Sequence, residues 1–387
     1  MNSLNNHNRS TQLIFGQFTF AALVHFGVLA VLPVFLTSHT SLEVSTVATL
    51  LFAASVIGKL GRVFVSLVID LLPSRNLLIF SSLVGAVILL MFPRLESAVA
   101  ICTAITIFNL SNGVNSISVR SLIANMKRTT ESRFLKYSKL SIATNIAAFV
   151  GPPAAFYFLT TANSISPFTA FSFLLAITSL VVFFFRKKIP DLHPQKNIVS
   201  GSIHCLKISR FRRLLVCTLI SYFSYAFMYN SVALYATYHL GLKDWSGVLL
   251  GLNALVVIAI TYPLNSWTEQ VGFNADKRIR LGFSLYLVAF LLPVLLNNPI
   301  IFVIAVLLWA LAESLMLPSL ISQATVDVSE SHHVAALTVY SIVVGFGEGI
   351  GVFTAVNLTT SSALNGSSGF LLAAGVSTVM LFVSRRV

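Results

Sequence analysis

Charged residues are scarce in this sequence. Asp, Glu, Lys and Arg make up 10% of its 387 residues, and only 12 residues are acidic, whereas an average soluble domain is about 25% charged. Hydrophobic residues account for 56%. The three cysteines, Cys102, Cys205 and Cys217, show neither a disulfide framework nor a metal-ligand spacing. This composition excludes a soluble globular protein and predicts an integral membrane protein.

Motifs of catalysis and of nucleotide binding are also missing. The glycine-rich segments do not resemble a phosphate-binding loop, and no Ser-His-Asp or metal-hydrolase spacing occurs. His332 and His333 are adjacent in a loop, a geometry poorly suited to joint metal binding. We therefore expect no catalytic residue, no cofactor and no bound metal. A membrane receptor or an intramembrane enzyme is the alternative from another class.

Long apolar runs recur along the whole chain, and no soluble domain fits between them. Each has about 20 residues, the length that crosses roughly 30 Å of hydrocarbon. They predict twelve transmembrane helices, at residues 12–36, 45–70, 77–93, 98–125, 138–160, 166–185, 214–239, 246–267, 281–297, 300–325, 335–360 and 368–384.

The basic residues predict which side of the membrane each loop faces. With the N-terminus inside, the cytoplasmic segments hold 19 of the 25 Lys and Arg residues, and the outer loops hold two, Arg94 and Lys243. This asymmetry follows the positive-inside rule with both termini cytoplasmic. The net charge of +13 therefore does not indicate nucleic-acid binding, and we expect the basic clusters of the central loop to meet anionic headgroups. We expect a multi-pass protein of the cell membrane, of the bacterial inner-membrane type.

The sequence repeats itself at about half its length. The segment "SLIANMKRTTESR" (121–133) is followed 198 residues later by "SLISQATVDVSES" (319–331), and Gly151 falls on Gly349 at the same offset. The longest polar connection, 186–213, lies between the sixth and seventh predicted spans. We predict an all-α integral membrane protein with two pseudo-symmetric six-helix bundles, 1–185 and 214–387, joined by a cytoplasmic linker, 186–213. A monomer is expected.

Three short motifs resemble those of the major facilitator superfamily, and the resemblance covers essentially the whole chain. The loop "IDLLPSR" keeps Asp70 and Arg75 of the family's signature between spans 2 and 3, with Pro73 in place of the usual Gly. In span 4, "NLSNG" lacks the arginine of the family's motif. In span 5, "AAFVGPPAAF" supplies the Gly151 and Pro152 of the antiporter signature.

The resemblance implies secondary transport of a small molecule, driven by an ion gradient. The Gly-Pro motif is similar to that of proton-coupled exporters, so protons are the expected coupling ion. The family's motifs imply roles in the conformational change for Asp70, Arg75, Gly151 and Pro152.

Two cations lie inside the second apolar run, in "VIGKLGRVF" (56–64). Lys59 and Arg62 are three residues apart, so they share one face of a helix. A cation at the centre of a membrane helix costs roughly 2.5–3.5 kcal/mol on insertion scales. Two interpretations are open. Both side chains extend to the membrane interface, or both face a water-filled cavity and bind an anion. Roughly ten residues separate Lys59 from the nearer helix end, at about 1.5 Å each, which favours the cavity.

Two acids lie at comparable depth, Glu313 in span 10 and Glu348 in span 11. Two roles are open for these acids. They form permanent ion pairs with Lys59 or Arg62 that hold the two halves together, or one of them carries a proton. Burial in a medium of low dielectric constant favours the neutral form of a carboxyl, so a proton carrier is a natural role. The two roles are compatible, because a pair that breaks on protonation couples proton and substrate.

Further polar residues within the spans complete the candidate site. Asn109, Asn112 and Asn115 form a stripe that lines the cavity or bonds neighbouring helices, and Tyr229 belongs to a tyrosine stripe on span 7. A lone histidine among apolar residues is a structural group or a substrate contact. We expect substrate contacts from Lys59, Arg62, His25, Asn112, Asn115, Arg120 and Tyr229.

The excess of intramembrane cations over acids favours an anionic substrate. Four basic residues lie within the spans, Lys59, Arg62, Arg120 and Lys139, against two acids. Within the family that the sequence resembles, exporters of small carboxylate-rich metal chelators (siderophores) would have such a site. Multidrug efflux and proton-coupled uptake of an organic anion are the competing functions.

Cysteine labelling tests whether the two cations of span 2 face water. Cysteines substituted for Lys59 and Arg62 should react with a small water-soluble thiol reagent, because a polar cavity admits the reagent. Val65→Cys provides the lipid-facing control. Labelling of all three cysteines at the same slow rate would contradict the cavity.

Overall fold

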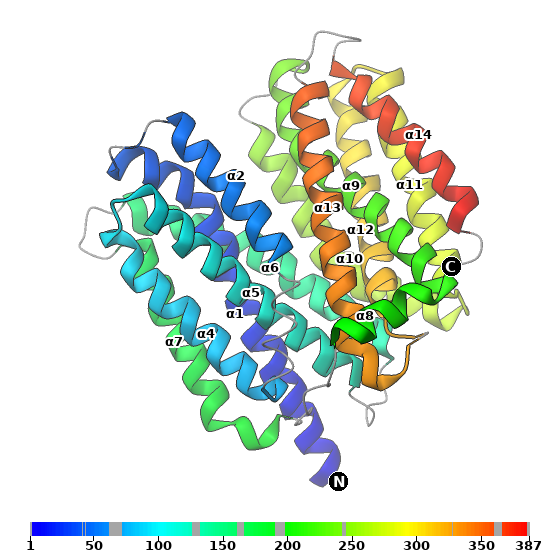
Figure 1. Ribbon diagram of the computed structural model, residues 1–387. Helices are drawn as coiled ribbons and strands as arrows, with labels where there is room; N and C mark the ends of the chain where they lie inside the picture. Colours follow the sequence, from blue (N-terminus) through cyan, green and yellow to red (C-terminus); the bar gives the residue numbers. More distant parts are fainter. Residues whose placement is uncertain are drawn as a thin grey trace. The chain divides into compact units, whose positions relative to one another are not determined.

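A computed structural model describes residues 2–40, 42, 44–61, 72–125, 132–160, 166–189, 198–241, 245–326, 328–359 and 366–384. Within these ranges the chain forms α-helices and short 3₁₀ turns joined by brief connections (Figure 1). Ten of the described helices are long and apolar enough to cross a bilayer.

Each predicted span coincides with one helix, and span 2 is described as far as Gly61. The helices of the first half are α1 (Asn2–His39), α2 (Val44–Leu60), α4 (Ser74–Met91), α5 (Ala98–Asn125), α6 (Arg133–Thr160) and α7 (Pro167–Phe184). Those of the second half are α9 (Ser209–Tyr238), α10 (Ser246–Gln270), α11 (Ala275–Leu295), α12 (Pro299–Gln323), α13 (His333–Thr359) and α14 (Ser368–Val383). A short helix, α8 (Ile198–Lys207), lies in the predicted linker. The predicted all-α fold of twelve transmembrane helices is confirmed.

Helix ends follow local capping chemistry. Asn298 caps α12, accepting hydrogen bonds from the backbone N–H groups of Ile300 and Ile301 at 2.8 and 3.5 Å. Pro299 occupies the first helical position, where its missing N–H costs nothing. Asn274 caps α11 in the same way through the N–H of Lys277, at 2.9 Å.

The described chain divides into two compact units. Unit 1 comprises Met1–Thr130, Ile146–Gly201 and Ser331–Thr338, and unit 2 comprises Glu131–Asn145, Ser202–Glu330 and Val339–Val387. Helix α6 therefore gives its first half to unit 2 and its second half to unit 1, while α13 gives its first residues to unit 1.

Both units use the same helix pairings. In unit 1, α4 packs on α5 and α7, α5 packs on α1 and α2, and α1 packs on α2 and α7. In unit 2, α11 packs on α12 and α14, α12 packs on α9 and α10, and α9 packs on α10 and α14. Each pairing in one unit has its counterpart six spans later, as a duplicated bundle requires.

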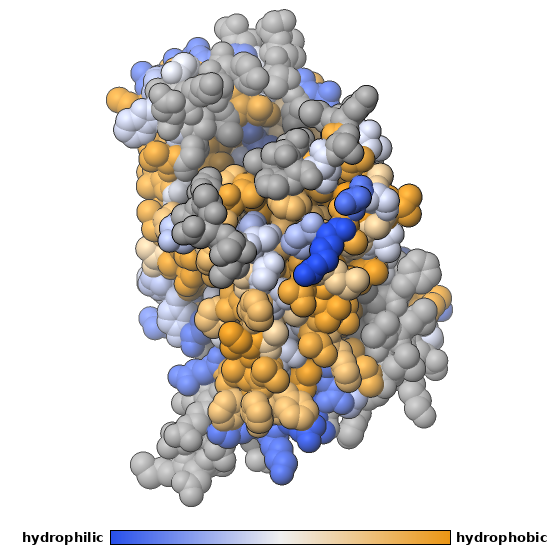
Figure 2. Space-filling view, turned by 90° about the vertical axis from the view of Figure 1, so that its left-hand side faces the viewer, coloured by the Kyte–Doolittle hydropathy of each residue, from blue (hydrophilic) through white to orange (hydrophobic). Residues whose placement is uncertain are grey.

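Aromatic and aliphatic side chains fill each unit and cover much of its outside. In unit 1, the rings of Phe35 and Phe92 each lie 4.7 Å from the ring of Phe168, between centroids. The outer faces of α4 and α7 expose large apolar side chains, among them Leu83, Val87, Leu90, Phe173, Ile177 and Leu180. Figure 2 shows one face of the molecule, on which apolar side chains cover most of the middle. Such a surface suits contact with lipid.

Glycine permits close helix contact in both units. A Cβ atom at Gly151 of α6 would lie 2.6 Å from the carbonyl oxygen of Leu23 and 3.0 Å from the nitrogen of Gly27, both in α1. In unit 2, Gly347 and Gly351 of α13 make the corresponding approach to the backbone of α9. A Cβ atom at Gly349 would meet open space. Gly349, which matches Gly151 at the 198-residue offset, is therefore not its structural counterpart. The glycines of α13 that contact α9 are Gly347 and Gly351, two residues before and after Gly349.

Substitution of these glycines tests the close contact. Gly151→Leu should lower the stability of the protein by about 1–3 kcal/mol, because the side chain overpacks the α1–α6 interface. Gly349→Leu is the matched control and should leave stability nearly unchanged. Thermal unfolding of the purified protein in detergent measures both. Equal midpoints for the two variants would contradict the packing.

Candidate functional site

The candidate site in unit 2 is built around a buried carboxyl. Glu313 lies in the middle of α12 with 2% of its surface exposed. The amide side chains of Asn145 from α6 and Asn253 from α10 lie near its carboxyl. Nδ2 of Asn145 donates to the backbone oxygen of Ser141 in its own helix, at 3.0 Å. Among the described residues, Oε2 of Glu313 and Nδ2 of Asn253 have no hydrogen-bond partner at ordinary distance. The carboxyl therefore has polar neighbours but retains unused hydrogen-bonding capacity.

Aromatic side chains stand beside the carboxyl. Tyr225 and Tyr229 of α9 lie 6.2 Å apart between ring centroids, and they lie 6.2 and 6.4 Å respectively from the ring of Trp309 in α12. Both tyrosines are within electrostatic range of Glu313. Trp309 is fully buried, whereas Tyr229 is 43% exposed. Tyr229 thus connects the buried acid with the accessible surface.

The second predicted acid shares a neighbour with the first. Glu348 lies in α13, is half-buried, and interacts electrostatically with Tyr225, as Glu313 does. Glu348 has a further interaction of its own. The structure therefore brings Glu313, Glu348 and Tyr229 to one region of unit 2.

A buried hydrogen-bond network holds the helices around Glu313. Nδ2 of Asn265 in α10 donates to Oγ of Ser138 in α6 at 2.9 Å and to the backbone oxygen of Ser314 in α12 at 2.8 Å. The hydroxyls of Thr261 in α10 and Ser314 in α12 share a hydrogen bond of 3.0 Å. All four residues are 0% exposed. Polar bonds between helices are favoured in a membrane because the groups would otherwise face hydrocarbon.

In unit 1, the asparagine stripe bonds helices at one of its positions. Asn115 is buried, and its Nδ2 lies 3.2 Å from Oγ of Ser81 and 3.4 Å from Oγ of Ser82, both in α4. Nε2 of Gln17 in α1 donates to the same Ser82 hydroxyl at 3.2 Å. For Asn115 the structure thus favours the helix-bonding alternative. Asn112 is half-buried.

The other predicted residues of unit 1 are distributed among several helices. The ring of His25 in α1 stacks on Phe108 of α5 with 6.0 Å between centroids. Arg120 and Arg75 are half-buried, on α5 and in the first turn of α4. Arg62, Asp70 and the side chain of Lys59 lie outside the described residues, so the predictions for them stay predictions.

Sequence reasoning missed Asn145 and Asn253. Each is an amide within a predicted span, and that position was the available signal. Both lie near the carboxyl of Glu313.

A second missed cluster lies at the start of α11. Arg278 is 8% exposed, its guanidinium carbon lies 3.6 Å from the ring centroid of Phe134 in α6, and Nη2 donates to the backbone oxygen of Phe273 at 2.7 Å. Glu269 at the end of α10 attracts Arg278 electrostatically. Glu269 and Gly272 follow Asp70 and Pro73 by 199 residues, and Gly272 has φ +73°. The repeat therefore carries, in this loop, the glycine that the first loop lacks.

A double-mutant cycle measures the network beside Glu313. Asn265→Ala, Ser138→Ala and the double variant should show a coupling of about 0.6 kcal/mol, and at most about 1.7 kcal/mol. The pair Asn265 and Ser141, one turn further along α6, is the control and should show none. Unfolding in detergent provides the free energies. Equal coupling for the two pairs would contradict the hydrogen bond.

Comparisons with known proteins identify the family. The sequence matches the family model "Major Facilitator Superfamily" over residues 14–352, and no curated protein sequence matches the chain. The fold is similar to that of the human organic anion transporter MFSD10 (TETRAN), with TM-score 0.76 and 16% identity over 98% of this chain and 99% of that chain.

Two further crystal structures share the fold. FucP, a Major Facilitator Superfamily transporter in the outward conformation, gives TM-score 0.79 and 13% identity over 98% of this chain and 99% of that chain. A mutant of the peptide transporter POT in complex with sulfate gives 0.68 and 12% over 97% and 94%. This chain belongs to the Major Facilitator Superfamily, and it is a multi-pass membrane protein that carries out secondary transport.

Proposed function

We propose that this protein exports a small hydrophilic anion, such as a carboxylate siderophore, in exchange for protons across the cell membrane, with both termini in the cytoplasm. The observation that carries the proposal is Glu313, a carboxyl buried in the middle of an apolar helix between two amide side chains.

The surroundings of Glu313 suit a group that exchanges a proton. An ionised group at mid-membrane costs at least roughly 2.5 kcal/mol, so a carboxyl there needs donors when charged and an acceptor when neutral. Amide side chains offer both a donor and an acceptor. Asn145 and Asn253 can therefore bond either form, and Tyr229 links the site to the exposed surface.

The intramembrane cations support an anionic substrate. Lys59, Arg62 and Arg120 lie within the spans, and buried cations call for an anionic partner. The similar fold of the human organic anion transporter agrees with this charge preference without establishing it. The Gly151-Pro152 motif in α6 supports export by antiport.

Multidrug efflux is the second candidate. The rings of Tyr225, Tyr229 and Trp309 beside Glu313 form an acidic aromatic wall, and such a wall also suits a lipophilic cation through cation–π attraction. The two functions differ in the charge of the substrate that they predict.

Proton movement in proteoliposomes separates the two candidates. A pH-sensitive dye in the lumen should report proton flow when citrate is supplied, and none when tetraphenylphosphonium is supplied, because the proposed site selects an anion. The converse result would establish multidrug efflux and overturn the proposal. Proton flow that accompanies citrate in the same direction would identify uptake instead of export.

Substitution of the buried acid tests its role as proton carrier. Glu313→Gln should abolish proton-driven citrate transport yet permit exchange of labelled citrate for unlabelled citrate, since the amide cannot release a proton. Glu348→Gln is the control at comparable depth and should keep the dependence on the pH gradient. If Glu313→Gln behaved as the wild type, Glu313 would be structural, and Glu348 or His25 would be the candidate.

A further inference from the structure

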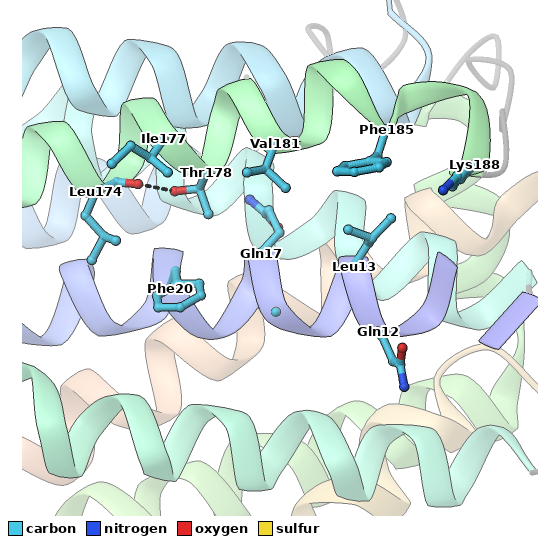
Figure 3. Close-up of a pocket in the computed structure, with 11 residues that line it drawn as sticks. Gln12, Leu13, Gln17, Phe20, Leu174, Ile177, Thr178, Val181, Phe185 and Lys188 are labelled. Atoms are coloured by element: carbon cyan, nitrogen blue, oxygen red, sulfur yellow. Dashed lines mark hydrogen bonds between the residues drawn. The ribbon is translucent and has the colours of Figure 1, made fainter. Parts of the chain in front are cut away.

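A groove of about 520 Å³ runs between α1 and α7, within unit 1. Figure 3 shows α1 below and α7 above it, with Leu13 and Phe20 on one side and Ile177, Val181 and Phe185 on the other. The groove adjoins the exposed apolar side chains of α7. In a membrane, lipid can therefore reach the groove from the side of these residues.

One end of the groove is basic. Lys188 lines it from the 3₁₀ turn Arg186–Lys188, which follows α7, and Gln12 lines the same end from α1 (Figure 3). Nζ of Lys188 lies 4.8 Å from the ring centroid of Phe185, and the guanidinium of Arg186 lies 4.7 Å from that of Phe183. Cations resting on aromatic rings at a helix end are typical of the boundary between hydrocarbon and headgroups.

A buried amide lies deeper in the groove. Gln17 is 4% exposed, and its side chain projects from α1 towards α7 (Figure 3). Its Nε2 donates to Ser82, while Oε1 has no hydrogen-bond partner among the described residues. A polar atom left unpaired in hydrocarbon is costly. If the amide turns by 180°, the Ser82 hydroxyl donates to its oxygen, and its N–H groups become available to a ligand that accepts hydrogen bonds.

We propose that this groove binds one anionic phospholipid. The phosphate lies beside Lys188 at the level of Gln12, an ester carbonyl accepts from the amide of Gln17, and an acyl chain follows the apolar walls. Gln17 lies five residues beyond Gln12, roughly 7.5 Å along the helix. That distance matches the roughly 5–7 Å depth of the interfacial layer on each side of the hydrocarbon. The neighbouring Arg186 favours an anionic over a zwitterionic headgroup.

Native mass spectrometry of the detergent-purified protein tests the site, with phosphatidylglycerol and phosphatidylcholine as probes at equal concentration. The wild type should retain one tightly bound phosphatidylglycerol. Lys188→Gln should weaken that binding about fivefold, the loss expected of one cation–headgroup contact. Lys187→Gln, which removes the same charge from the adjacent residue outside the groove, should weaken it less than about twofold.

Gln17→Leu should also weaken binding, with its folding checked by thermal unfolding in lipid-free detergent. If that variant fails to fold, the comparison of the two lysine variants still tests whether the lipid binds in the groove. Equal losses for Lys187→Gln and Lys188→Gln would mean general attraction to a basic surface and would overturn the site. Equal retention of the two lipids by the wild type would also overturn it. None of these outcomes depends on transport, so they leave the proposed function untouched.

Discussion

The cost of an unpaired polar group in hydrocarbon is the constraint on which this structure depends. Water is not available there to replace a missing partner, so an intramembrane amide, hydroxyl or carboxyl is expected to be bonded within its own helix, bonded by another helix, or to have a function. Asn265, Ser138 and Thr261 meet the first condition, since their bonds join three helices of unit 2. Glu313 meets it only in part, because Oε2 stays unpaired among the described residues. Among the described residues it is the one carboxyl with a buried oxygen that has no hydrogen-bond partner, and this singles it out.

The position of α6 connects this carboxyl to the larger fold. The first half of α6 supplies Ser138 and Asn145 to unit 2, and its second half, with Gly151 packed on α1, belongs to unit 1. A shift of α6 relative to α10 and α12 would therefore change the donors around Glu313. Pro152 interrupts the backbone hydrogen bonds of α6 beyond Asn145, which gives the helix a point at which to bend. In the proposed function, this connection offers a route from conformational change to proton exchange.

The two duplicated units share helix pairings but differ in chemistry at related positions. Asn115 and Glu313 are 198 residues apart, and both are buried near the middle of the corresponding helices α5 and α12. Asn115 is bonded to α4 through Ser81 and Ser82, so unit 1 places a neutral, bonded group where unit 2 places an acid. In this proposal, the two units share their helix packing because they arose by duplication. The proton site exists in unit 2 because the residue at this position differs between the units.

Hydropathy and the internal repeat were enough to predict the twelve helices, because a span of about 20 apolar residues is the dominant signal in a membrane protein. The depth of Glu313 could also be predicted, since it follows from position within a span. Its partners could not. Asn145 and Asn253 come from two helices whose rotation depends on packing, and the sequence does not determine that rotation. The same limit explains why Gly347 and Gly351, rather than Gly349, contact α9, and why Arg278 was not recognised as a residue buried against Phe134.

The zero-flux condition tests the central claim, that one buried carboxyl couples one proton to each transported anion. Proteoliposomes with the voltage clamped at zero would be given a fixed gradient of the transported anion and a series of pH gradients. If one proton exchanges through Glu313 per cycle, net flux should vanish when about one pH unit opposes each tenfold anion gradient. If flux instead vanished only when the anion gradient itself was abolished, at every pH gradient, no proton would be coupled to transport and the account would be wrong.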